Sequence, residues 1–176
     1  LPISQNLLLT ARISQNPNFD EHGANWYYDG DWKTPSSWAY YLAKTNDTGF
    51  VSQYFHDDSG GSSQWGPSLY TIMHSIYTGQ LASDGVLSAS FDNDSSGRWL
   101  FDDYSALQGL AAYKYIATRI GNTGEAQWAD SAYNSLLSHL NTLVGNNESA
   151  NGFSYLPCTV DQPNSANRCT TYNDAN

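Results

Sequence analysis

The feature that most constrains the fold is a pair of helical patterns joined by a short glycine-containing link. Apolar residues recur at helical spacing from 107 to 116 and again from 128 to 143. We predict one helix that ends at Gly121, and a second that begins at Thr123 and ends at Gly145. Because so short a link joins antiparallel helices, this part of the chain predicts a helical hairpin.

The rest of the chain also favours helices over strands. Further helices are predicted for Ile3–Ser14, from Thr34 and Pro35 onward, after a cap at Asp47, and from Gly66 and Pro67 onward. The best strand pattern, Gly85–Phe91, is weak. A chain of 176 residues is long enough for one compact domain. We therefore predict a single all-α domain over 1–176.

The predicted links between these helices alternate in length. Two are short, at Thr45–Asp47 and Gly121–Gly124, and the others are long, at Gln15–Lys33, Asp57–Gly66, Ser88–Phe101 and from Asn146 onward. If the short links make antiparallel hairpins, all long loops lie on one face, with the N-termini of helices that begin near Pro35, Pro67 and Tyr104. This arrangement requires Gln80–Leu87 to return the chain to that face.

Aromatic and acidic residues collect in the long loops. The formal net charge is −10, from 7 basic and 17 acidic residues, and such a surface repels nucleic acid. The loop tryptophans are Trp26, Trp32, Trp65 and Trp99, and the charged residues beside them are Asp29, Asp31, Arg98, Asp102 and Asp103. Flat rings and carboxylates together favour a surface for neutral sugars. The alternative is that these rings only pack the loops onto the helices.

The cysteines and the glycosylation sequons favour an oxidising, extracellular environment. Cys158 and Cys169 lie close together in a loop-rich tail, 146–176, which predicts one local disulfide and not a zinc site. N-glycosylation sequons begin at Asn46, Asn93 and Asn147. No apolar run approaches the length of a membrane span, and a first residue other than Met predicts processing. We therefore expect a secreted glycoprotein with no nucleic-acid or membrane partner.

Two segments resemble a known superfamily. WAYYLAKTNDTGF, at Trp38–Phe50, and DDYSALQGLAAY, at Asp102–Tyr113, are similar to hairpins of the six-hairpin glycosidases, whose fold is an (α/α)6 toroid. The resemblance covers about Asn25 to Gly145 and implies helical hairpins with an active site at the N-terminal ends of the inner helices. A full toroid has twelve helices, so the resemblance also implies that this chain is part of a larger toroid. In that case the chain is a proteolytic or truncated piece, or its partner segment is a second chain, and one of the two catalytic carboxylates can lie outside this sequence.

The stretch DNDSSGRWLFDDYSALQGL, residues 92–110, allows three interpretations. As an EF-hand calcium loop it would use Asp92, Asp94, Ser96, Gly97 and Asp103, although no helix is predicted before it. As a helix start, Asp102 or Asp103 would be an N-terminal cap stabilised by the helix dipole. As a catalytic site, the two neighbouring carboxyl groups would raise one another's pKa, as a general acid requires.

These observations together predict a glycoside hydrolase that acts on a neutral poly- or oligosaccharide. Asp102 or Asp103, with Asp29 or Asp31, would supply general acid/base catalysis without a cofactor or metal. The predicted substrate-binding residues are Trp26, Trp32, Trp65, Trp99 and Arg98. Two alternatives remain open. A polysaccharide lyase on the same fold would need more basic residues for its acidic substrate, and a non-catalytic glycan-binding protein would keep the aromatic face without paired carboxylates.

Overall fold

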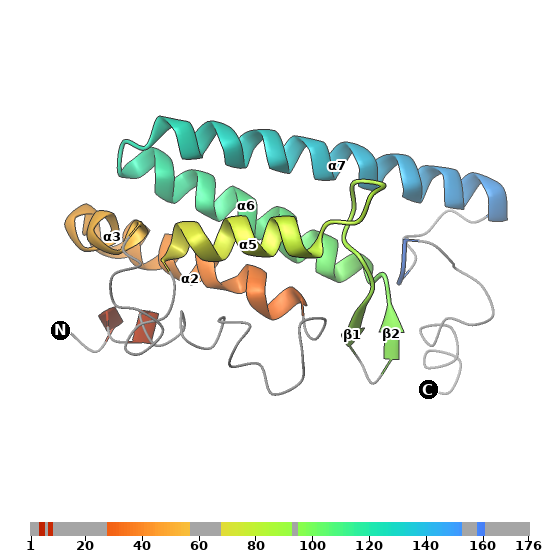
Figure 1. Ribbon diagram of the computed structural model, residues 1–176, viewed down its shortest axis with the longest axis horizontal. Helices are drawn as coiled ribbons and strands as arrows, with labels where there is room; N and C mark the ends of the chain where they lie inside the picture. Colours follow the sequence, from red (N-terminus) through yellow and green to blue (C-terminus); the bar gives the residue numbers. More distant parts are fainter. Residues whose placement is uncertain are drawn as a thin grey trace.

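The computed structural model describes residues 4–5, 7–8, 28–56, 68–92, 95–152 and 158–160, and it is mostly helical (Figure 1). The helices are α2 (Tyr28–Thr45), α3 (Thr48–Phe55), α5 (Leu69–Gln80), α6 (Leu100–Arg119) and α7 (Thr123–Asn151). Two short strands, β1 (Ser90–Asp92) and β2 (Ser95–Gly97), form an antiparallel hairpin. The all-α prediction is confirmed. No helix in this described part of the chain is both long and apolar enough to span a membrane.

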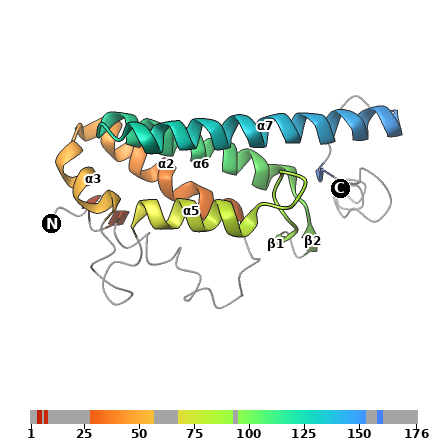
Figure 2. The same cartoon turned by 45° about the horizontal axis from the view of Figure 1, so that its top comes forward.

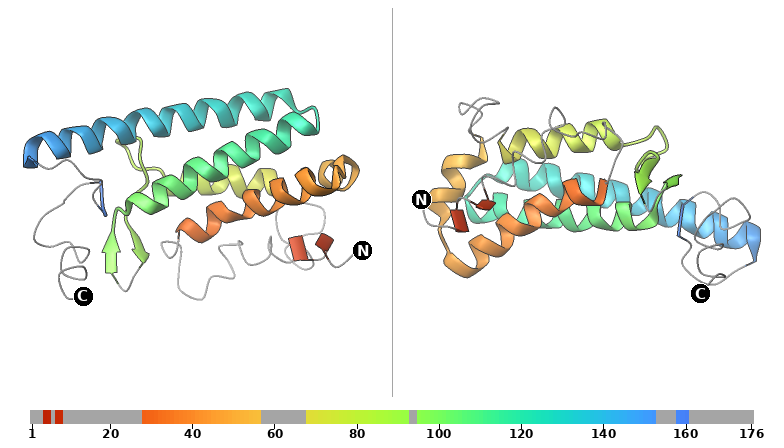
Figure 3. Two further views of the ribbon diagram at one scale, coloured as in Figure 1. Left: turned by 180° about the vertical axis from the view of Figure 1, so that it is seen from behind. Right: turned by 90° about the horizontal axis from the view of Figure 1, so that it is seen from below.

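The helices pack as a layered bundle in which α2 and α6 run parallel, side by side. Both helices begin near the β1–β2 hairpin and extend toward the α6–α7 turn (Figures 1 and 3). The α7 helix returns antiparallel along α6 as the predicted hairpin, and α5 also runs antiparallel to both α2 and α6 (Figure 2). The N-termini of α2 and α6 therefore share one end of the bundle.

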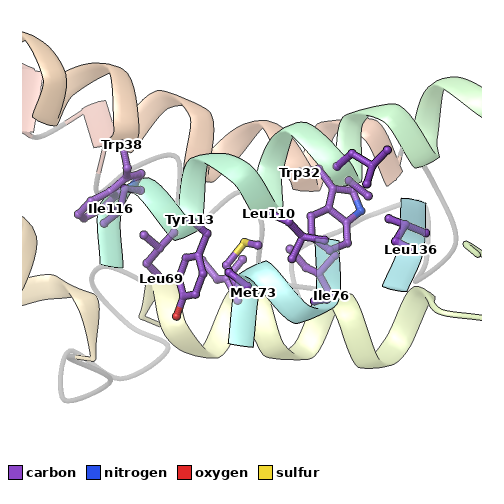
Figure 4. Packing of buried hydrophobic residues seen from close by; sticks show 14 of the residues in the cluster. Trp32, Trp38, Leu69, Met73, Ile76, Leu110, Tyr113, Ile116 and Leu136 are labelled. Atoms are coloured by element: carbon purple, nitrogen blue, oxygen red, sulfur yellow. The ribbon is translucent and has the colours of Figure 1, made fainter. Parts of the chain in front are cut away.

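A single apolar core joins all five helices. Figure 4 shows part of this core, with labelled side chains Trp32, Trp38, Leu69, Met73, Ile76, Leu110, Tyr113, Ile116 and Leu136. Each of these residues is almost fully buried. Burying a side chain of this size contributes roughly 1.5–3 kcal/mol relative to leaving it in water, so the core is the main source of stability.

Gly109 sets how closely α2 and α6 approach each other. A Cβ atom at this position would lie 2.7 Å from the backbone oxygen of Trp32 and 2.9 Å from its ring atom Cε3. No side chain fits in that space without moving backbone. The two parallel helices can therefore pack this tightly only with glycine at 109.

Three of the predicted helix starts are confirmed, including Thr123 at the start of α7. The Asp47 carboxylate caps α3 by accepting a hydrogen bond from the Phe50 N–H at 3.0 Å. The α5 helix begins at Leu69, directly after Pro67, and Ser68 caps it through the Thr71 N–H. Local capping chemistry was sufficient to place α3 and α5.

Two helix boundaries were predicted wrongly. The α2 helix begins at Tyr28, so Pro35 lies inside it, and Asp29, Asp31 and Trp32 are helical and not in a loop. Burial of apolar side chains on both sides of Pro35 outweighs the one hydrogen bond that proline omits. The α7 helix continues through Gly145, previously expected to end it, and ends at Gly152, whose φ of 71° lies in the left-handed region. The predicted tail, 146–176, is therefore helical at its start.

The prediction that all long loops share one face is also wrong. His56, which follows α3, donates to or accepts from Asn122 in the α6–α7 turn at 3.2 Å. Its ring lies 4.5 Å from that of Tyr70, in the first turn of α5. Hence α5 begins at the end of the bundle where the short links lie. The reason is that α3 is too short to carry the chain back along the bundle.

We predict that Gly109→Ala destabilises the protein by about 1–3 kcal/mol, because the added methyl group would force α2 and α6 apart. The matched control is Gly145→Ala, in α7, where no atom would lie within 4 Å of the new Cβ. That variant is expected to gain up to about 1 kcal/mol from the higher helix propensity of alanine. Urea unfolding measures both. Equal stability of the two variants would contradict the tight α2–α6 contact.

Candidate functional site

The candidate site is a cluster of four acids where the parallel helices α2 and α6 begin. Asp29 and Asp31 lie in the first turn of α2, and Asp102 and Asp103 in the first turn of α6. The backbone N–H of Asp29 donates to Asp102 Oδ1 at 3.1 Å, which places the first turns of the two helices side by side. Helix N-termini carry partial positive charge, so this end of the bundle favours carboxylates. The structure therefore brings Asp29 and Asp102 together, while the carboxyl groups of Asp31 and Asp103 are bonded to other partners.

Asp102 fastens three segments to one another. Its side chain is only 1% exposed. Besides the Asp29 N–H at Oδ1, it accepts a hydrogen bond at Oδ2 from the Ser90 hydroxyl, at 2.6 Å. Asp102 therefore links the start of α6 to the start of α2 and to β1.

Asp103 is buried more completely and is less well satisfied. Its side chain is 0% exposed, and Oδ1 accepts a hydrogen bond from the Leu87 N–H at 3.0 Å. Oδ2 is buried with no hydrogen-bond partner among the described residues. Burial raises the pKa of Asp103 to about 7, against the opposing effects of the Leu87 N–H and the positive charge of Arg98. Asp103 can therefore gain or lose a proton near neutral pH.

Neither acid is the cap that the sequence suggested. The N-cap of α6 is Trp99, and no side chain caps the helix there. Asp102 and Asp103 point instead to partners distant in sequence, namely Asp29, Ser90 and Leu87. Tertiary contacts have taken the place of the local capping bond.

The calcium-loop interpretation is also wrong. An EF-hand needs a helix before its loop, but the segment contains the β1–β2 hairpin, with Ser96 and Gly97 in β2 and Asp92 in β1. Asp103 is already engaged by the Leu87 N–H. Among the described residues, no group of three or more His, Cys, Asp or Glu side chains could hold a metal ion. Asp94 lies outside those residues.

The two acids of α2 differ from those of α6 in being partly exposed. The Asp29 carboxylate pairs with Lys33, one turn later, and its side chain is 21% exposed. Asp31 is half-buried, and its Oδ2 accepts a hydrogen bond from Gln80 Nε2 at 2.6 Å. The Gln80 Oε1 atom in turn accepts from Trp32 Nε1 at 2.8 Å. Asp29 and Asp31 are thus held in place while still reaching the surface.

Three of the predicted sugar-binding residues have other roles. Trp32 is 0% exposed and Trp99 is 3% exposed, so both rings pack inside the molecule and present no face to a sugar. The Arg98 guanidinium donates to the Leu87 backbone oxygen at 3.0 Å and pairs with Asp84 at 2.8 Å. Trp26 and Trp65 lie outside the described residues, so their roles stay predictions.

Three residues of the site were not predicted from the sequence. They are Gln80, Leu87 and Ser90, whose hydrogen bonds hold Asp31, Asp103 and Asp102. No motif marks them, because a backbone N–H, an amide and a hydroxyl become site residues only through the fold. Ser90 stands out only in the structure, where its polar side chain is buried, and nothing in the neighbouring sequence predicts this burial.

The disulfide prediction is supported at one cysteine. Cys158 is disulfide-bonded, and Cys169, the only other cysteine of the chain, lies outside the described residues. Among the sequon asparagines, Asn46 is exposed in the turn between α2 and α3. Asn147 is half-buried in α7, where its side-chain N–H donates to the Val160 oxygen at 3.2 Å. Asn93 lies outside the described residues, and glycosylation at all three stays a prediction.

A second polar cluster lies at the opposite end of the bundle. Glu125 Oε2 lies 2.8 Å from His74 Nε2 and accepts a hydrogen bond from the Tyr113 hydroxyl at 2.9 Å. Burial, with the Glu125 charge, raises the pKa of Tyr113 far above its usual value. The His74 ring also stacks on Trp128 at 3.9 Å. The cluster joins α5, α6 and α7, so it has a structural role.

Comparison with protein-family models, curated proteins and solved structures finds no match. A function for this chain therefore has to be argued from the acidic cluster itself.

We predict that replacing Asp103 changes how stability depends on pH. The pKa is about 7 in the folded chain against an ordinary value of 3.8, so between these pH values the folded state keeps a proton that the unfolded state has lost. The contribution of Asp103 to the free energy of unfolding is therefore full below pH 4 and is lost as pH rises to about 7. The total loss is of the order of a few kcal/mol.

Asp103→Asn removes this titration, because its amide keeps an acceptor for the Leu87 N–H and carries no charge. The difference in stability between wild type and variant should change steadily from pH 4 to pH 7, as measured by urea unfolding. Asp130→Asn, at an exposed position of α7, is the control and should show no such trend. A constant difference for Asp103→Asn would contradict the raised pKa.

Proposed function

We propose that this chain is a glycoside hydrolase that acts on a neutral poly- or oligosaccharide. The observation that carries the proposal is the meeting of two acid pairs at the shared N-terminal end of α2 and α6, one pair partly exposed and the other buried. Hydrolysis of a glycosidic bond requires two carboxyl groups, one to donate a proton and one to act as base or nucleophile. This end of the molecule supplies carboxyl groups in different environments.

The partly exposed acids are the better candidates for contact with a substrate. In the proposal, Asp29 or Asp31 supplies one of the two catalytic carboxyl groups, because side chains two residues apart on a helix do not face each other. The Asp102 carboxylate holds the Asp29 backbone N–H, and Gln80 holds the Asp31 carboxylate. Asp102 and Asp103 are then positioning residues, since their buried carboxyl groups cannot meet a sugar while the site is closed over them.

The substrate class follows from charge. With 17 acidic and 7 basic residues, the chain would repel an acidic polysaccharide. In addition, three of the basic side chains are already paired with acids, Lys33 with Asp29, Arg98 with Asp84, and Lys114 with Asp130. These facts favour a neutral sugar polymer.

The finer fold proposal is that these hairpins belong to an (α/α)6 toroid. Parallel packing of α2 on α6, with α7 antiparallel outside α6, is the arrangement expected of inner and outer toroid helices. In this proposal the other hairpins and their carboxylate are supplied by a partner segment. Mass measurement of the purified protein under native and denaturing conditions tests this point. A co-purifying polypeptide is expected, and a single species that hydrolyses glycosides alone would contradict it.

The two alternatives receive less support. A non-catalytic glycan-binding protein would need exposed rings, and two of the four predicted loop tryptophans, Trp32 and Trp99, are buried. A lyase would need a base such as tyrosine next to an acidic substrate. It would also need basic residues to bind that substrate, but the chain has only 7, and three of them are paired with acids.

Activity measurements on two variants test the catalytic roles. We predict that at least one of the two variants Asp29→Asn and Asp31→Asn reduces hydrolysis of a neutral oligosaccharide panel by about 100-fold or more, as expected for loss of a general acid or base. Release of reducing ends is the measurement. Asp130→Asn is the matched control for Asp29→Asn, because each loses an exposed aspartate paired with a lysine.

The products distinguish the alternatives. Full activity in both folded variants would reject Asp29 and Asp31 as catalytic residues. Binding of oligosaccharides without any cleavage would favour the glycan-binding protein. Products with a new carbon–carbon double bond, detected by ultraviolet absorption, would favour the lyase.

A further inference from the structure

The segment between α5 and β1, Leu81–Ser90, lies across the buried acids of α6, and we call it the strap. Its Leu87 N–H donates to Asp103 Oδ1 at 3.0 Å, and its Ser90 hydroxyl donates to Asp102 Oδ2 at 2.6 Å. Both contacts join the strap to the first turn of α6. The strap therefore contributes to the almost complete burial of the two carboxyl groups.

The turn in the middle of the strap contacts α7 at a glycine. Gly85 has a φ of 85°, and a Cβ there would lie 2.5 Å from the His139 ring. The turn is closed by a hydrogen bond from the Ala82 N–H to the Val86 oxygen at 2.8 Å. Figure 1 shows this turn rising from the end of α5 to reach α7. Besides these contacts with α7 and with the acids of α6, the strap places Val86 and Leu87 in the core, and its Ser88 hydroxyl hydrogen-bonds with the Tyr28 hydroxyl of α2.

The charges that face Asp103 favour its neutral form while the strap is closed. Asp102 lies beside it on α6, and Asp84 lies on the strap itself, so an ionised Asp103 would be repelled from both. Arg98, between β2 and α6, opposes this repulsion but is already bonded to Asp84 and to the Leu87 oxygen. The hydrogen bond from the Leu87 N–H to Oδ1 favours the charged form of Asp103. The other oxygen, Oδ2, is buried away from water and accepts no hydrogen bond from the described residues.

We propose that the strap is a proton-controlled clamp on α6. With a proton on Asp103, the strap stays closed over the two acids. When Asp103 ionises, the carboxylate gains solvation only if the strap moves away from α6, so ionisation favours the open form. The like charge of Asp84 on the strap acts in the same direction. This inference concerns the chain's own conformation and holds whether or not the protein is a hydrolase.

Amide hydrogen exchange of the full chain tests the clamp. Rates are corrected for the intrinsic pH dependence of exchange and compared at pH 5 and pH 7. We expect the protection of the Leu87 N–H and its strap neighbours to fall by at least about tenfold as Asp103 loses its proton. Core amides of α7 should keep their protection, which distinguishes local release from global unfolding. Asp103→Asn should keep the strap protected at both pH values, and Asp130→Asn should behave as the wild type does.

Three outcomes would overturn the proposal. One is strap protection that does not change with pH in the wild type, and another is an unchanged pH response in Asp103→Asn. The third is equal loss of protection in the strap and in α7. If Asp103→Asn does not fold, the wild type decides the question by carbon-13 NMR of the Asp103 carboxyl carbon. Its titration midpoint must coincide with that of strap release, and separate midpoints would reject the clamp.

Discussion

The close packing of α2 against α6 at Gly109 is the contact on which the rest of the structure depends. Because the Trp32 backbone lies where any other side chain at 109 would be, the two helices run parallel at short distance along the core. Their N-termini then meet at one end and bring four acids together. The same contact buries the Trp32 ring, whose indole N–H is satisfied by Gln80 and, through it, linked to Asp31.

Environment, and not residue type, divides the four acids into two kinds. Asp102 and Asp103 are neighbours in sequence, yet Asp102 accepts hydrogen bonds at both oxygens while Asp103 has one oxygen buried without a partner. Asp29 and Asp31, in the first turn of α2, are each partly exposed to solvent. The end of the bundle where α2 and α6 begin therefore contains two buried acids that hold the structure together and two acids that are accessible from solvent.

The sequence predicts those parts of the fold that local chemistry decides. Asp47 and Ser68 lie where short-range capping bonds form, and Gly121, with its left-handed φ, lies in the turn where α6 ends. Prediction from the sequence fails where the burial of side chains outweighs the local conformational preference of a residue. Pro35 suggests the start of a helix but lies in the interior of α2. Gly145 suggests the end of a helix, but α7 continues beyond it. The acids were identified as candidates, but their partners were not, because a backbone N–H such as that of Leu87 has no sequence signature.

The identity of residue 103 is itself informative about function. A buried carboxyl oxygen without a partner costs about 1–3 kcal/mol, so Asp103 weakens the fold at neutral pH. An asparagine could accept the same hydrogen bond from Leu87 without the cost of a buried charge. The property that only the acid has is a change of charge near neutral pH, which follows from its pKa of about 7. Packing alone does not require that property, and it is the property on which the proposed clamp depends.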